Sequence, residues 1–267
     1  MNCRKSLAVV LFGFCCSLAV SAGAANNDLG IGSSASSTPG SSADQQELRA
    51  RIHTDLGAGY FSRGQYAIAL DELHTALQAN DRYAPAYDVL GLVYMALGEN
   101  KPAEDNFLHA LDLAPGNPDI HNNYGWFLYN RGQYSDAMQQ FTTALANPLY
   151  AKPQSALTNA GLCMMKMGKP LQAETYFGKA LEHDPNDPQA NYELANLYYQ
   201  QQRYQEASRP IARLLANSAP SAKLLWLGVR IAHKSGDHDT EASDSLLLRN
   251  RFPDAPETQL LLQGKFD

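Results

Sequence analysis

The feature that most restricts the fold of this chain is a repeat of about 34 residues. A residue pair, most often Leu-Gly, recurs along the sequence, and its second members are spaced 34, 34, 36, 34 and 33 residues apart. These second members are Gly57, Gly91, Gly125, Gly161, Ala195 and Gly228. Such a period is typical of arrays in which each unit is one supersecondary structure that packs on its neighbours.

Other landmarks keep the same spacing and predict two helices in each unit. A second glycine is expected to end the first helix in a left-handed conformation, at Gly64, Gly98, Gly132 and Gly168. On the second helix, small side chains would let neighbours approach, at Ala69, Ala103, Ala137, Ala173 and Ala207, and again at Ala76, Ala110, Ala144 and Ala180. Large apolar side chains would fill the gap between helices, at Leu73, Phe107, Phe141, Phe177 and Ile211.

Proline cannot continue a helix interior, so Pro115, Pro148 and Pro185 are expected in turns. The complete pattern resembles the tetratricopeptide repeat, a helix–turn–helix unit. The fold class that this resemblance implies is an all-α superhelical solenoid of about six units, each a pair of helices, with a C-terminal capping helix.

The repeat domain is expected at residues 47–267. Its units are predicted at 50–83, 84–117, 118–151, 154–187, 188–220 and 221–254. The sixth unit is degenerate, because its second helix has an alanine, Ala242, about two places late. Two extra residues near Ala151–Pro153 are expected to lengthen the turn between units three and four, and residues 255–267 are expected to form the cap.

The N-terminus has the composition of a secretory leader. Arg4 and Lys5 precede an apolar stretch, Leu7–Val20, and an Ala-x-Ala cleavage signal ends at Ala24. Residues 1–24 are therefore predicted to be a signal peptide, with a buried N-terminal helix as the alternative. Residues 25–46 are predicted to be a flexible linker rich in Ser and Gly, because they offer almost nothing apolar to bury.

Removal of this leader leaves 19 basic and 27 acidic residues, a net charge of −8, and a single cysteine, Cys163. Its apolar neighbours indicate a buried, inert thiol, and one cysteine excludes an internal disulfide. The absence of a basic excess argues against a nucleic-acid partner. No apolar run after the leader is long enough to span a membrane.

By the resemblance, five positions on each first helix face a concave groove. The predicted partner-binding residues are Ala58, Phe61, Leu92, Met95, Asn122, Trp126, Tyr129, Met165, Tyr192, Asn196 and Tyr199. Tyr, Trp and Asn suit peptide capture, because rings give contact area at low entropic cost and amides can bond a backbone. Packing between units is the alternative explanation of these aromatic residues. The carboxylate clamp, which binds its partner through Lys, Arg and Asn, is not matched, because Lys166 is the only Lys at the predicted groove positions.

Two segments resemble a narrower family, the type IV pilus biogenesis and stability proteins of the PilF/PilW type. They are Asn147–Tyr150 followed by Asn159–Cys163, and Leu224–Ala232 followed by Arg251–Pro253 and Glu257. The resemblance implies a pilotin that helps the pilus secretin subunit reach the outer membrane and form multimers, which pili and twitching motility require. Other pilus assembly proteins are further expected partners.

The same resemblance implies a periplasmic protein associated with the outer membrane. Family members are usually lipoproteins, but Cys15 and Cys16 lack the residues of a lipobox. A soluble periplasmic form and an atypically processed lipoprotein therefore both stay open, and the only expected membrane contact is a lipid anchor.

No enzyme is predicted. The sequence contains neither a nucleophile elbow nor a phosphate-binding loop, and His233 and His238 lie near no second cluster of metal ligands. No metal or other cofactor is therefore expected. The alternative function is a periplasmic repeat adaptor for another cell-envelope machine.

Overall fold

The computed structural model describes residues 41–266, and all of its regular elements in this range are α-helices. The helices are α1 (Ser42–Ser62), α2 (Tyr66–Ala79), α3 (Ala84–Leu97), α4 (Asn100–Leu113), α5 (Pro118–Asn130), α6 (Tyr134–Leu145), α7 (Pro153–Lys166), α8 (Pro170–His183), α9 (Pro188–Gln200), α10 (Tyr204–Asn217), α11 (Ala222–Ser235), α12 (His238–Arg251) and α13 (Pro256–Leu262). The predicted all-α repeat solenoid is confirmed. The signal peptide prediction lies outside the described residues.

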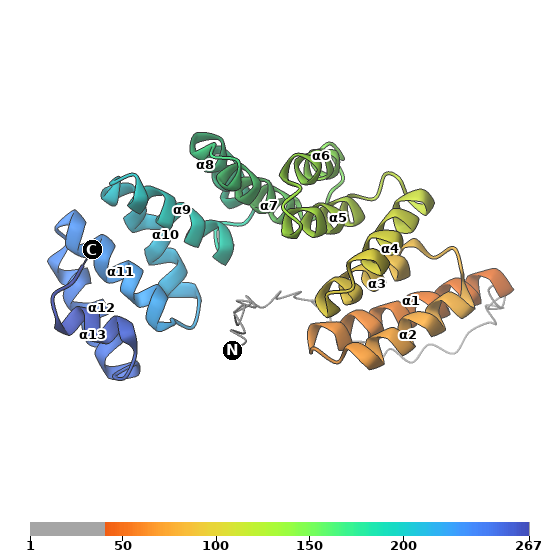
Figure 1. The fold of residues 1–267 in the computed structure, drawn as a ribbon, viewed down its shortest axis with the longest axis horizontal. Helices are drawn as coiled ribbons and strands as arrows, with labels where there is room; N and C mark the ends of the chain where they lie inside the picture. Colours follow the sequence, from red (N-terminus) through yellow and green to blue (C-terminus); the bar gives the residue numbers. More distant parts are fainter. Residues whose placement is uncertain (1–40, 267) are drawn as a thin grey trace, which may run out of the picture. The chain divides into compact units, whose positions relative to one another are not determined.

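The chain divides into two compact parts, which meet in the sequence between Pro115 and Gly116. The first part contains α1 to α4 and the second contains α5 to α13. Within each part, odd- and even-numbered helices form antiparallel pairs (Figure 1). Each even-numbered helix also packs on the odd-numbered helix that follows it in the same part.

The glycine of each Leu-Gly-type pair permits the close approach of the two helices. A Cβ atom built on Gly125 would lie 2.7 Å from Cε1 of Phe141, and one built on Gly161 would lie 2.5 Å from Cε1 of Phe177. Both phenylalanines are fully buried. The five first alanines and the four second alanines of the predicted pattern are fully buried as well. The packing roles predicted for these landmarks are therefore confirmed.

The turns also follow the predicted pattern. The four glycines after the first helices, Gly64, Gly98, Gly132 and Gly168, all have positive φ. In unit five a glutamine, Gln202, holds the same position with φ 60°. The turn between α6 and α7 covers residues 146–152 and is longer than the other turns between units, such as 80–83 and 184–187. The predicted lengthening is confirmed.

The start of α1 differs from the linker prediction. The helix begins at Ser42, so residues 42–46 of the predicted linker are helical. Ser41 and Asp44 form a reciprocal capping box, in which each side chain accepts a hydrogen bond from the other residue's backbone N–H. Residues 41–49 are all exposed, so local capping, not burial, defines this first turn.

Unit six departs from the pattern by one residue. Its left-handed glycine is Gly236, eight residues after Gly228, where the earlier units have seven. The buried residues of α12 are Ser245 and Leu248, one place later than the repeat would put them. Ala242, predicted to be the displaced packing alanine, is exposed. The additional residue between Gly228 and Gly236 shifts the buried positions of α12 by one residue, which explains why Ala242 is not buried.

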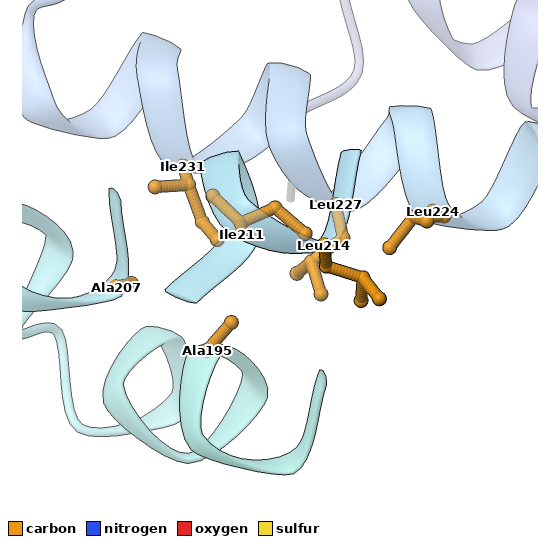
Figure 2. Close-up of a cluster of buried hydrophobic side chains, with 7 residues drawn as sticks. All are labelled: Ala195, Ala207, Ile211, Leu214, Leu224, Leu227 and Ile231. Atoms are coloured by element: carbon orange, nitrogen blue, oxygen red, sulfur yellow. The ribbon is translucent and has the colours of Figure 1, made fainter. Parts of the chain in front are cut away.

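A shared core joins units five and six. Side chains from α9, α10 and α11 meet in one cluster, which Figure 2 shows with Leu214 and Ile211 of α10 between the other two helices. The cluster contains Ala195, Ala207, Ile211, Leu214, Leu224, Leu227 and Ile231. The predicted cap is shorter than 255–267, because α13 ends at Leu262 and residues 263–266 continue beyond it.

Candidate protein-binding face

The predicted groove residues all lie on the first helices of units one to five. Ala58 and Phe61 are on α1, Leu92 and Met95 on α3, Asn122, Trp126 and Tyr129 on α5, Met165 on α7, and Tyr192, Asn196 and Tyr199 on α9. Ten of them are partly exposed, which leaves surface for a partner and also anchors each side chain. We call these ten, without Asn122, the first-helix face, which has one segment on α1 and α3 and another on α5, α7 and α9.

Asn122 differs from the other ten. Its side chain is only 6% exposed, and its Oδ1 accepts a hydrogen bond from Nδ2 of Asn159 on α7 at 3.0 Å. The residues at the same repeat position in three other units, Thr54, Asp88 and Thr158, are also buried. Asn122 therefore links α5 to the next first helix, α7, and belongs to the packing between units, not to an open surface.

The aromatic residues of the face are supported by further rings. The ring of Trp126 stacks on Tyr129 with centroids 5.0 Å apart and an interplanar angle of 12°. Tyr129 also contacts Tyr134, the first residue of α6, at 5.5 Å. Phe61 with Tyr66, and Tyr199 with Tyr204, repeat this contact in units one and five. Rings held in this way lose little further freedom when a partner binds.

Burial changes the acid–base properties of this region. It raises the pKa of the Tyr129 hydroxyl to about 12 and that of the Cys163 thiol to about 12. Cys163 is a free, fully buried cysteine, in agreement with the predicted inert thiol. Burial also raises the pKa of Glu193 on α9, although a hydrogen bond from Gln189 opposes the effect. The first-helix face is thus aromatic, apolar and amide-bearing, with little charge.

A second apolar surface, which the predicted groove does not include, lies on α1. Leu48, Ile52 and Leu56 are 46%, 47% and 44% exposed and are spaced four residues apart, so they form one stripe along the helix. Leu90 stands at the repeat position of Leu56 but is 3% exposed, because α3 packs on the preceding helix α2. The first unit has no described helix before it. The repeat register could have revealed this α1 stripe.

Two surface hollows lie away from the first-helix face. One is lined by residues of α8 and by Tyr198, and the other by residues at the start of α1 and the end of α2. In the first hollow, Glu174 already accepts hydrogen bonds from Arg203 and Tyr198. The bonds from Arg203 are the main cause of its lowered pKa. This carboxylate therefore links α8 to Tyr198 on α9 and to Arg203, the residue before α10.

The described residues show no group that could hold a metal ion. Between positions 41 and 266, no three His, Cys, Asp or Glu side chains come together in a suitable arrangement. His233 and His238 both lie beside one carboxylate, Glu241, at 2.9 Å and 3.6 Å. Within the same range, none of the helices combines the length and the apolar character needed to cross a membrane.

Comparison with known proteins identifies the family. Tetratricopeptide repeat models match residues 84–117, 106–139 and 164–225. The type IV pilus assembly protein PilF of Pseudomonas aeruginosa is 33% identical over 207 residues, which cover 78% of this chain and 82% of PilF. This chain belongs to the PilF/PilW family of tetratricopeptide-repeat proteins. An uncharacterised Haemophilus influenzae protein is 29% identical over 60% of this chain and 79% of its own length.

Solved structures agree with membership of the PilF/PilW family. The structure of Pseudomonas aeruginosa PilF superposes with a TM-score of 0.74 at 32% identity, covering 83% of this chain and all of PilF. The structure of PilW, described as a widely conserved type IV pilus biogenesis factor, gives a TM-score of 0.70 at 30% identity. It covers 80% of this chain and 98% of PilW. The family resemblance predicted from the sequence is confirmed.

Proposed function

We propose that this protein is a non-enzymatic scaffold for type IV pilus biogenesis, which binds the pilus secretin subunit and assists its localisation and multimerisation. The observation that carries the proposal is the relationship to PilF along nearly the whole repeat array. The partly exposed aromatic and apolar side chains of the first-helix face support a role in binding protein. The proposed location is the periplasm, at the outer membrane.

The proposal is tested by co-purification of the secretin with the mature chain from envelope extracts of a piliated strain. A deletion strain is expected to lose secretin multimers and twitching motility. Normal multimers together with normal motility would refute the role. A defect in cell shape with intact pili would instead assign the protein to another envelope machine.

A double substitution, Phe61→Ala with Met95→Ala, separates binding from folding. Both side chains are partly exposed, so their loss is expected to weaken secretin binding about tenfold or more while lowering the melting temperature only slightly. Leu48→Ala with Ile52→Ala is the matched control on the α1 stripe. If this control alone weakens binding, the stripe and not the first-helix face contacts the secretin.

Mass spectrometry of the mature N-terminus tests the proposed location. A free N-terminus near Ala25 would indicate a soluble periplasmic protein. A diacylated Cys15 or Cys16 would indicate a protein anchored to a membrane.

A further inference from the structure

The first-helix face is covered in unit six. Val229 and Ala232 stand at the repeat positions of Ala58 and Phe61, but they are only 0% and 3% exposed. Val229 belongs to a buried cluster with Leu225, Trp226 and Leu248, against which residues of α13 and Phe266 pack. The C-terminal end of this chain therefore lies on a surface that the other units leave open.

Phe266 makes specific contacts there. Its ring stacks on His233 with centroids 4.0 Å apart and an interplanar angle of 9°, and lies 5.7 Å from the ring of Trp226. Its backbone carbonyl accepts a hydrogen bond from the hydroxyl of Tyr199 at 3.4 Å. The guanidinium of Arg230 lies over the rings of Tyr199 and Trp226, with its Cζ atom 4.7 Å and 5.8 Å from their centroids. We call Tyr199, Trp226, Arg230 and His233 the aromatic slot.

A defined turn brings Phe266 to the slot. Gly264 adopts a left-handed φ of 65° after α13. The N–H of Gly264 donates to the carbonyl of Leu261, and that of Lys265 donates to Leu260, the two hydrogen bonds of a Schellman motif. This motif reverses the chain, and Figure 1 shows the C-terminus running back from α13 toward α11. Because Gln263, Gly264 and Lys265 are exposed, the ring of Phe266 provides most of the attachment.

The slot recognises groups that any polypeptide can supply. It takes an aromatic ring by stacking and a backbone carbonyl by one hydrogen bond. It also contains a hydrogen-bond donor without an acceptor, because Nε of Arg230 is buried and has no hydrogen-bond partner. A buried donor without an acceptor is unfavourable, so a ligand with a second carbonyl or a carboxylate would satisfy the site better than the tail does. Tyr199 also belongs to the first-helix face, so the two surfaces are continuous.

We propose that the aromatic slot is a binding subsite for a partner polypeptide that presents an aromatic side chain next to a carbonyl or carboxylate acceptor. In the free protein, Phe266 occupies the subsite as an intramolecular competitor. The tail benefits from an effective concentration in the millimolar range, so a partner that makes further contacts along the first-helix face can displace it. The identity of the natural partner rests on the proposed function, but the existence of the subsite does not.

The test uses the full mature chain with Phe266→Ala, which empties the subsite. The chain has two tryptophans, so Trp126→Phe leaves Trp226 as the only fluorescent reporter. The probe is an acetylated peptide of residues 263–267. It is expected to shift the Trp226 emission saturably, with half-saturation at about 1 mM, toward the spectrum of the protein with its tail intact. The protein that keeps Phe266 is expected to respond at least fivefold more weakly.

A peptide with alanine in place of Phe266 is the matched control and is expected to give no response. The absence of a saturable response up to about 10 mM, in a variant of unchanged helicity, would overturn the proposal. The titration contains no pilus protein. A positive titration with failed secretin co-purification would therefore reject the proposed function alone, and the reverse result would reject the subsite alone.

A second variant keeps Phe266 and changes only the turn. Gly264→Ala strains the left-handed residue without a clash, since no atom lies within 4 Å of an added Cβ, and Gly98→Ala does the same after α3. Gly264→Ala is expected to increase the peptide response at least twofold, whereas Gly98→Ala leaves it unchanged. Equal responses from the two variants would show that the tail does not compete for the slot.

Discussion

Leu56 in unit one and Leu227 in unit six both stand directly before the repeat glycine, yet 44% of Leu56 is exposed and only 3% of Leu227. Leu227 packs in the core that α9, α10 and α11 share, whereas no described helix precedes α1. The C-terminal end is further covered by α13 and Phe266. A repeat position thus sets the direction of a side chain, and the neighbouring unit decides whether it is buried.

The largest effect is expected where α1 packs on α2, the face of α1 opposite the exposed α1 stripe. A Cβ on Gly57 would lie 2.8 Å from Cγ of the fully buried Leu73, so Gly57→Leu is expected to force α1 and α2 apart. We expect a loss of about 3 kcal/mol or more in the free energy of unfolding, measured by urea denaturation. Gly59→Leu, where an added Cβ would have no atom within 4 Å, is the control and should cost far less.

Truncation of Leu56 and of Leu227 to alanine tests directly whether the two ends differ in burial. Leu227→Ala is expected to lower the free energy of unfolding by about 2 to 3 kcal/mol, because it leaves a cavity in a packed core. Leu56→Ala is expected to cost less than about 1 kcal/mol, since much of that side chain already contacts water. Both are measured by urea denaturation followed by circular dichroism. Equal losses would mean that the α1 stripe is covered in solution.

A third prediction concerns Asp244, which takes the repeat position that Leu73 holds in unit one. Its Oδ2 is buried without a hydrogen-bond partner, and burial raises its pKa above the ordinary value of 3.8. The folded state therefore binds this proton more tightly than the unfolded state, and the ionised form lowers stability at neutral pH. Asp244→Asn is expected to stabilise the protein by about 1 kcal/mol at pH 7.

The gain from Asp244→Asn should disappear as the pH falls through the raised pKa of Asp244 toward 3.8, because the wild-type carboxyl is then neutral too. Thermal unfolding between pH 3 and pH 8 measures the difference. Asp254→Asn removes the same charge from an exposed turn and is the control. A gain that is the same at every pH would contradict this account.

The smallest expected effect concerns the turn after each first helix. Unit one has Gly64 there, whereas unit five has Gln202, the only non-glycine residue with positive φ among those described. Gln202→Gly is expected to raise the free energy of unfolding by about 0.5 kcal/mol, because glycine adopts this conformation without steric cost. Gln200→Gly, at the last residue of α9, replaces a helical residue with glycine and should lower it by up to a similar amount. Both changes are small enough to need chemical denaturation in replicate.

The sequence predicted most of this fold because each repeat landmark has a local physical role. Gly125 and Phe141, 16 residues apart, were enough to indicate a close pair of helices. Unit six was harder, since one additional residue before Gly236 moved the buried positions of α12 by one place, from 244 and 247 to Ser245 and Leu248, and left Ala242 exposed. An alanine alone does not indicate which face of a helix is buried.

The candidate site was predicted less completely. The repeat register predicted eleven groove residues, of which ten are partly exposed. Asn122 is buried and accepts a hydrogen bond from Asn159 in the next unit. The contacts of Phe266 depend on a chain reversal at Gly264, and no repeat landmark marks that turn. A polar contact made by one pair of units, and contacts beyond the last unit, lie outside what a repeating pattern can encode.

The lengthened turn between α6 and α7 gives the array a place that can accept foreign sequence. Tyr150 is buried against Ala144 and Ala156, and Asn147 bonds the carbonyl of Gly116, so both ends of the turn are fastened. Between them, Leu149 is 89% exposed. An epitope tag or a small reporter domain inserted after Pro148 would therefore enter at an exposed tip, away from the helix contacts, and would leave both chain ends unmodified for envelope experiments.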